Sequence, residues 1–136
     1  MSAKELVEAA IGRIEALNPQ LNAVIAVNPN ALANAQALDG LTAGQVKHGV
    51  LHGIPVLVKD NIETLDPMPT TAGSLALQDN ITSRDSPLVA RLRAAGAVIL
   101  GKLNMHEAAL GATTDNPWFG RCESPLRAGY TPGGSS

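Results

Sequence analysis

Aromatic residues are scarce in this chain, since Trp118, Phe119 and Tyr130 make up only 2% of its 136 residues. So small a supply argues against a stacking platform for nucleic-acid bases and against an aromatic-rich interface. The charge is also nearly balanced, with 10 basic and 12 acidic residues and a net charge of −2. A positive surface for a phosphate backbone or an anionic membrane is therefore lacking. We expect no directly bound nucleic acid and no membrane partner.

Cysteine and long apolar runs are scarce as well. Cys122 is the single cysteine and has no partner for an internal disulfide, which favours a reducing compartment such as the cytoplasm. Charged residues recur through residues 1–17, which argues against a signal peptide, and no apolar run is long enough to span a membrane. What the chain does contain is 45% hydrophobic residues, enough for the core of one domain.

The first helix is indicated by its cap. Ser2 and Glu5 have the spacing of a capping box, in which each side chain bonds the free backbone amide of the other residue. Asn18-Pro19 stops the pattern that follows, because proline interrupts a helix. The apolar residues between these signals recur at spacings of three and four and form one stripe: Leu6, Val7, Ala10, Ile11, Ile14 and Leu17.

Short apolar runs then alternate with helical patterns. Asn28-Pro29 and Asp85-Ser86-Pro87 each place a capping residue before a proline, as at the first turn of a helix. Helices and strands in this order predict an α/β fold in which helices cover a mixed or parallel sheet. The predicted elements are a strand at 21–27, a helix from 29 to 38, a surface connection at 39–49, a buried strand at 54–58 covered on both faces, a loop at 63–73, a helix from 87 to 95, a strand at 97–100 and a short helix near 104.

Lys59 follows three consecutive apolar residues at the end of the predicted strand at 54–58. If these neighbours keep its amine from water, the neutral form is favoured and the amine can act as a general base. The alternative is a lysine that emerges into solvent at a strand end, the commoner situation for this residue. Asp60 and Asn61 come next, and either bond the amine, brace the loop or form the turn. Burial of Lys59 decides between these interpretations.

The chain ends in Gly133-Gly134-Ser135-Ser136, two flexible residues beside two hydroxyls. Glycine allows a serine to approach a partner closely in a strained backbone, but the same composition is typical of flexible linkers. His106 is far from His48 and His52 in the sequence, and none of the three histidines shows metal-ligand spacing with Cys122 or the carboxylates. We therefore expect no metal and no cofactor.

Four segments carry a resemblance to a known family. They are Leu-His-Gly-Ile-Pro-Val-Leu-Val-Lys-Asp-Asn-Ile at 51–62, Pro-Thr-Thr-Ala-Gly-Ser at 69–74, Ala-Gly-Ala-Val-Ile-Leu-Gly-Lys-Leu-Asn-Met-His-Glu at 95–107 and Pro-Gly-Gly-Ser-Ser at 132–136. In composition, order and spacing they resemble the amidase signature family, and the likeness extends over nearly the whole chain. The resemblance implies that residues 1–136 are the N-terminal fragment of a single amidase domain, with an incomplete sheet.

The resemblance also implies a Ser, cis-Ser, Lys triad. Lys59 matches the family's catalytic lysine, and Ser135 matches its bridging serine, which follows a cis peptide bond. In the family a neutral lysine takes a proton from the bridging serine, which in turn deprotonates a nucleophilic serine. The nucleophile forms an acyl-enzyme from an amide, and water then releases the acid. The implied substrate is a small-molecule carboxamide, with ammonia or an amine as the second product.

The family's nucleophilic serine belongs to a later glycine-serine segment, beyond Ser136, which also forms the oxyanion hole. We therefore expect residues 1–136 to be inactive alone. Two alternatives stay open. One is the amidase subunit of a tRNA-dependent amidotransferase, where the triad frees ammonia from glutamine for a partner subunit. The other is a non-catalytic interaction module on the same scaffold. A homodimer of the full-length enzyme is also compatible with the resemblance.

Overall fold

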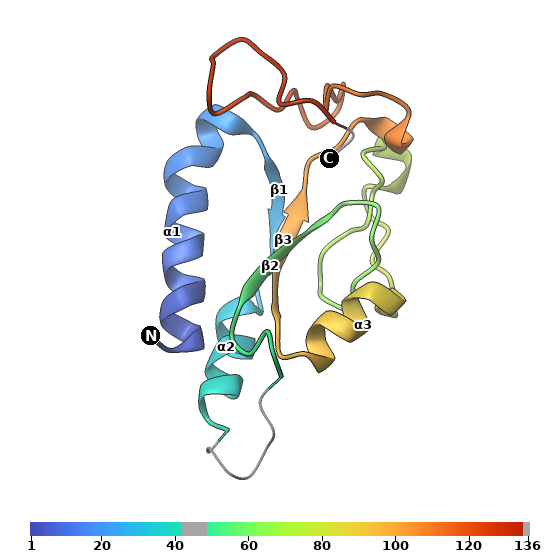
Figure 1. Cartoon of the computed structure of the whole chain (residues 1–136). Helices are drawn as coiled ribbons and strands as arrows, with labels where there is room; N and C mark the ends of the chain where they lie inside the picture. Colours follow the sequence, from blue (N-terminus) through green and yellow to red (C-terminus); the bar gives the residue numbers. More distant parts are fainter. Residues whose placement is uncertain (42–48, 135–136) are drawn as a thin grey trace.

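A small sheet covered by helices on both faces forms the centre of the molecule. The computed structural model describes residues 1–41 and 49–134, so most of the connection predicted at 39–49 lies outside the described residues. Helices α1 (Ala3–Leu21) and α2 (Ala31–Asp39) lie on one side of the sheet, and α3 (Pro87–Ala94) lies on the other (Figure 1). The arrangement confirms the predicted α/β class.

The predicted capping box at the start of α1 is present. The Ser2 hydroxyl accepts a hydrogen bond from the Glu5 amide at 3.1 Å, and the Glu5 carboxylate accepts one from the Ser2 amide at 2.7 Å. Two further amides, of Lys4 and Ala3, donate to the carboxylate of Asp39 at the end of α2 and lower the pKa of that carboxyl. The first turn of α1 is therefore fixed by its own sequence and by its neighbouring helix.

Helix α1 continues past the predicted stop at Asn18-Pro19 and ends at Leu21. Pro19 lies in the last turn, where its missing amide removes one hydrogen bond and the chain is about to leave the helix. The Asn18 side chain accepts hydrogen bonds from the amides of Ala23 and Val24, both at 2.8 Å, and so guides the chain into the first strand. The prediction was wrong because it treated this proline as a helix breaker.

The sheet has the order β1-β3-β2. Strand β3 (Val98–Leu103) is central, antiparallel to β1 (Val24–Val27) and parallel to β2 (Pro55–Lys59), so the predicted mixed sheet is confirmed. The burial predicted for 54–58 was wrong: within β2 only Val58 is fully buried, because β2 has β3 on one side and is an edge strand among the described residues. The strand buried almost throughout is β3, which also runs beyond its predicted end at residue 100.

Side chains of β3 alternate between the two faces of the sheet. Val98 and Leu100 pack with Val7 of α1 and with α2, whereas Ile99 packs with Val89 of α3. This alternation follows from the period of two in a strand. The strand therefore anchors both hydrophobic clusters of the described chain, which explains why it is rich in branched apolar residues.

The alternation is interrupted after Leu100. The register of β2 against β3 skips Leu100, so the next pair on β3 is made by Gly101. Strict alternation would place Lys102 on the same face as Leu100. Because Leu100 is skipped, Lys102 pairs with Val58, and the Lys102 side chain lies on the α3 face of the sheet. One register shift thus decides where a charged side chain points.

Helix α3 begins as predicted, with Ser86 as its cap. The Ser86 hydroxyl accepts a hydrogen bond from the Val89 amide at 3.3 Å, and Pro87 occupies the first turn. The helix stops before Gly96, whose φ of 90° belongs to the left-handed region. A Cβ at this position would lie 2.8 Å from the His52 Cα atom, so glycine serves both the turn and the close approach.

The loop between β2 and α3 is tied to α3 by ion pairs. The Arg93 guanidinium donates to Asp85 at 2.8 Å and also to Asp66, and Asp66 accepts a second hydrogen bond from Asn28 at 2.8 Å. Burial works against the charge on Arg93, but the bonds to Asp85 and Asp66 prevail and raise its pKa. These contacts hold the loop against α3 and the end of β1.

The remaining elements match the predictions in kind and differ at their bounds. Helix α2 begins at Ala31 rather than 29, and the strand predicted at 21–27 is the shorter β1. The segment 63–73 is a loop, and the short helix expected near 104 is a single 3₁₀ turn, η2 (Glu107–Ala109). Another 3₁₀ turn, η1, spans Leu75–Leu77. In the described part of the chain, no helix combines the length and the apolar character required to cross a bilayer.

Candidate active site

Lys59 is the last residue of β2, and it is half-buried. Its carbonyl accepts a hydrogen bond from the Ile62 amide at 2.9 Å, which closes a turn through Asp60 and Asn61. In the parallel ladder Lys59 pairs with Leu103, so the ends of β2 and β3 lie at the same edge of the sheet. Side chains that leave the carboxyl ends of parallel strands are well placed to form a site. Lys59 is therefore neither fully solvated nor enclosed by the described residues.

Asp60, the next residue, points into the protein and is only 1% exposed. Its Oδ2 atom accepts hydrogen bonds from the amide of Thr71 at 3.1 Å and from the Thr71 hydroxyl. Its main chain bonds Leu103 at 3.2 Å and Ala72 at 3.0 Å. Of the interpretations of Asp60 that the sequence left open, bracing of the loop is supported by the bonds to Thr71, and turn formation is supported by the turn that the Ile62 amide closes.

The Asp60 carboxylate is nevertheless incompletely compensated. Its Oδ1 atom is buried and has no hydrogen-bond partner among the described residues. Burial raises the pKa of Asp60, and the bonds from Thr71 and the charge of Lys102 act in the opposite direction. A buried acceptor without a donor is uncommon in folded proteins and is often found where function requires it.

Lys102 supplies the charge opposite Asp60, and its side chain is completely buried. The Nζ atom donates to the Ile62 carbonyl at 2.6 Å and to the Thr70 hydroxyl at 2.8 Å. Burial lowers the pKa of Lys102, while the charges of Asp60, Asp66 and Glu63 raise it. The sequence singled out Lys59 as the lysine with apolar neighbours. The buried one is Lys102, and the apolar run around it was the signal that could have identified it.

The described part of the terminal glycine segment lies close to the same end of the sheet. The Thr114 hydroxyl donates to the Gly133 carbonyl at 2.8 Å. Two residues further along this loop, Asn116 donates to the carbonyls of Gly73 and Met105, at 2.8 and 2.9 Å. Figure 1 shows the loop near the carboxyl end of β3. Ser135 itself lies outside the described residues, so its contact with Lys59 stays a prediction.

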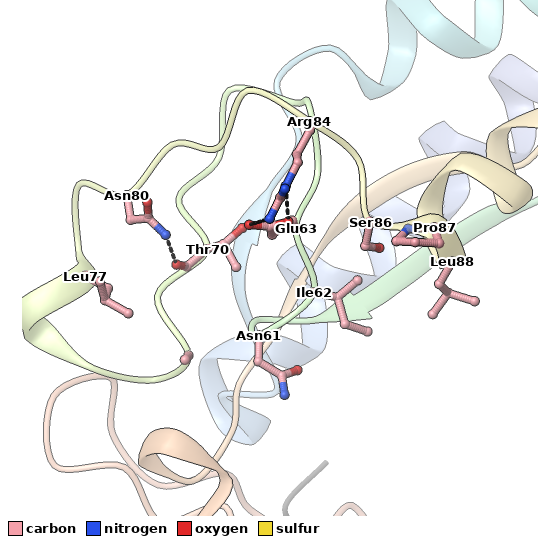
Figure 2. Close-up of a pocket in the computed structure, with 11 residues that line it drawn as sticks. Asn61, Ile62, Glu63, Thr70, Leu77, Asn80, Arg84, Ser86, Pro87 and Leu88 are labelled. Carbon is pink, nitrogen blue, oxygen red and sulfur yellow. Dashed lines mark hydrogen bonds and ion pairs between the residues drawn. The ribbon is translucent and has the colours of Figure 1, made fainter.

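A groove of about 500 Å³ begins two residues after Lys59 (Figure 2). Such a volume is within the range of small-molecule sites. Arg84 forms an ion pair with Glu63 at 2.8 Å, and Asn80 donates to the Thr70 carbonyl at 2.9 Å, so both contacts join the walls of the groove. The groove is lined by the turn at 61–63, by Thr70 and Ala72, and by Leu77, Asn80, Arg84, Ser86, Pro87 and Leu88.

Comparison with known proteins identifies the family. The sequence model of the Amidase family matches residues 5–136. This chain belongs to the amidase family. A glutamyl-tRNA(Gln) amidotransferase subunit from Anaeromyxobacter sp. (strain K) is 44% identical over 137 residues, which cover 100% of the amidase-family chain and 28% of the relative. A probable amidase of Arabidopsis thaliana is 42% identical over 143 residues, which cover 100% of this chain and 28% of the Arabidopsis protein.

Solved structures agree with the sequence relatives. The native peptide amidase from Stenotrophomonas maltophilia superimposes with a TM-score of 0.88 and 44% sequence identity, over 99% of the amidase-family chain and 29% of the peptide amidase. The chain thus spans less than a third of the length of each of these relatives. The predicted family and the predicted correspondence to the N-terminal part of the amidase fold are confirmed.

Proposed function

We propose that this amidase-family chain provides Lys59 as the general base and Ser135 as the bridging serine of an amide hydrolase. The nucleophilic serine would come from another part of the full-length protein, and residues 1–136 would be the N-terminal fragment of a single amidase domain. The substrate would be a small-molecule carboxamide, cleaved to an acid and ammonia or an amine. The family match over residues 5–136 supports this assignment.

The structural observation that carries the proposal is the placement of Lys59. It stands at the carboxyl end of β2, beside the end of β3, at the start of a turn closed by the Ile62 amide. Asp60 fixes the backbone directly after it through Thr71. A base must be held by a rigid scaffold if it is to meet its proton donor in a productive geometry. The turn closed by Ile62 and the bonds between Asp60 and Thr71 provide such a scaffold for Lys59.

In the proposed reaction the amine of Lys59 accepts the proton of the Ser135 hydroxyl, and Ser135 accepts the proton of the nucleophilic serine. The nucleophile adds to the amide carbonyl, and the leaving nitrogen receives the proton that Lys59 took up, by way of Ser135, as its bond to carbon breaks. Water then gives a proton to the same relay and attacks the acyl-enzyme, and the nucleophilic serine recovers a proton from the relay as the acid is released. The proton relay returns to its starting state, so neither a metal nor a cofactor is required to balance the reaction.

A second candidate function is supported by one of the relatives. The glutamyl-tRNA(Gln) amidotransferase protein from Anaeromyxobacter is 44% identical to this chain. The same triad would then release ammonia from glutamine for a partner subunit. An assay of the full-length protein with glutamine, with and without candidate partners, separates the two functions. Hydrolysis of simple carboxamides without a partner favours the amidase, and partner-dependent glutamine hydrolysis favours the amidotransferase.

Two properties of the full-length enzyme complete the proposal. A cytoplasmic location is supported by the single, unpaired Cys122. A homodimer is compatible with the family resemblance and stays a prediction that size-exclusion chromatography with light scattering would test.

Lys59→Ala in the full-length enzyme tests the proposed base. Loss of a general base typically costs about 10²- to 10⁴-fold in rate. We expect the variant to lower kcat and kcat/KM together, because the base acts in the transition state rather than in substrate binding. Steady-state kinetics on a carboxamide substrate measure both constants. Lys4→Ala is the control, since Lys4 is exposed on α1 and pairs with Glu8 at 3.6 Å.

The result that would contradict the proposal is a kcat for folded Lys59→Ala close to that of Lys4→Ala. Lys59 would then be a structural or substrate-binding residue. A rise in KM at unchanged kcat would indicate the second of these roles.

A further inference from the structure

Lys102 is a buried cation in contact with the segment that begins at Lys59. We propose that Lys102 is a positioning residue for catalysis: its ammonium group holds the turn after Lys59 and the loop segment around Thr70 in their working arrangement. The inference rests on the proposed function, in which Lys59 is the base. It concerns a residue that does not touch the substrate and acts through the backbone that carries Lys59.

The burial of Lys102 requires an explanation beyond packing. Its side chain is completely inaccessible and lies on the central strand of the sheet. Lysine is rarely buried, and an apolar residue of similar volume often stabilises such a position as well or better. A buried ammonium group is therefore a poor choice for filling space. Its distinctive property is that it can donate several hydrogen bonds in fixed directions.

The Lys102 ammonium group bonds the loop after Lys59 at two residues, Ile62 and Thr70. One hydrogen bond goes to the Ile62 carbonyl at 2.6 Å, and the amide of the same residue donates to the Lys59 carbonyl at 2.9 Å. The other goes to the Thr70 hydroxyl at 2.8 Å, directly before Thr71, which bonds the Asp60 carboxylate. Lys102 therefore links the turn after Lys59 to the returning part of the same loop.

Charge compensation comes from this loop as well. Asp60, Asp66 and Glu63 all interact favourably with the ammonium group, and burial opposes it. Asp60 retains one buried oxygen without a hydrogen-bond donor among the described residues. If the loop moved away from β3, the buried ammonium group of Lys102 and the buried carboxylate of Asp60 would each lose the opposite charge that compensates it. The charge on Lys102 and the conformation of the loop that follows Lys59 are therefore coupled.

The test uses full-length enzyme and a simple carboxamide substrate. Lys102→Met removes the ammonium group and keeps a chain of similar length. We expect kcat, per mole of folded protein, to fall at least about tenfold while KM changes less than about threefold, because substrate contacts are retained and the base is misplaced. Lys4→Met is the matched control, since it removes an exposed lysine from α1. Size-exclusion chromatography and thermal unfolding define the folded fraction.

A second pair of variants keeps the proposal falsifiable if Lys102→Met does not fold. Thr70→Val removes the acceptor hydroxyl at nearly constant shape, and Thr70→Ser retains it. We expect Thr70→Val to have a kcat at least about fivefold below that of Thr70→Ser, again with similar KM values. A purely structural role would reduce the amount of folded enzyme in both pairs and leave kcat per folded molecule unchanged.

The outcomes separate this inference from the proposed function. If Lys59→Ala abolishes turnover and folded Lys102→Met turns over within threefold of Lys4→Met, the positioning role is wrong and the proposed base stands. If Lys102→Met is unfolded, equal kcat values for the two Thr70 variants refute the positioning role. If Lys59→Ala itself keeps a normal kcat, the proposed function fails first and the positioning role fails with it.

Discussion

Removal of the Arg93 guanidinium should destabilise the fold far more than removal of any exposed arginine. Arg93 is 28% exposed at its side chain, and its partners Asp66 and Asp85 are 5% and 9% exposed. Arg93→Met would leave two nearly buried carboxylates side by side without their cation. Breaking a buried pair in this way costs about 3–5 kcal/mol.

The hydrogen bonds that survive place the expected cost at the lower end of this range. Asp66 keeps its bond from Asn28 at 2.8 Å, and Asp85 keeps one from the Leu65 amide at 2.8 Å. We therefore expect a loss of about 3 kcal/mol in the free energy of unfolding. With a urea dependence of about 1–3 kcal/mol per M, typical of small proteins, the urea midpoint should fall by about 1–3 M.

Urea titration of the 136-residue chain at neutral pH, followed by far-UV circular dichroism, measures this midpoint. Arg91→Met is the matched control, because Arg91 is exposed on the same helix. Its effect should stay within about 0.5 kcal/mol. Asp66→Asn added to Arg93→Met should recover part of the loss, since it removes one of the two stranded charges. Equal midpoints for Arg93→Met and Arg91→Met would refute the buried-pair interpretation.

Three other predictions concern stability and activity. Burial raises the pKa of Asp60, so its carboxyl stabilises the fold fully below pH about 4 and this contribution is lost as the pH rises through the folded-state pKa. Asp60→Asn should therefore gain stability relative to the parent between pH 4 and 7, by about 1.4 kcal/mol per unit of pKa difference, and a pH-independent difference in urea midpoints would contradict this. Gly12→Ala should stabilise the fold by about 0.5–1 kcal/mol, because the added Cβ atom meets nothing within 4 Å. Gly101→Ala should destabilise the fold by about 1–3 kcal/mol, because the added Cβ atom would lie 2.2 Å from a backbone carbonyl oxygen. Thermal unfolding compares the two variants, and equal changes in stability would contradict this interpretation. Purified 1–136 should hydrolyse no simple aryl or aliphatic amide, and turnover that survives repurification and disappears in a base-deficient variant would show that no further serine is needed.

Local sequence signals were sufficient where the structure is locally determined. The capping box of Ser2 and Glu5 and the cap at Ser86 use residues within three positions of each other, and both are present as predicted. The α/β class and the family could also be predicted, because alternating helical and apolar runs and several spaced motifs constrain them together. The end of α1 could not, since its continuation past Pro19 depends on hydrogen bonds that the Asn18 side chain accepts from the amides of Ala23 and Val24.

The tertiary structure alone decided which strand is central and which lysine is buried. In the sequence the run before Lys59 and the run around Lys102 are both apolar, so either could mark the interior. Strand order puts β2 at an edge of the described sheet and β3 at its centre, and the register shift at Leu100 turns Lys102 toward the loop after Lys59. Strand order and register depend on pairing between residues that are distant in the sequence, and a one-residue shift reverses the face of every side chain beyond it. No local pattern contains that information.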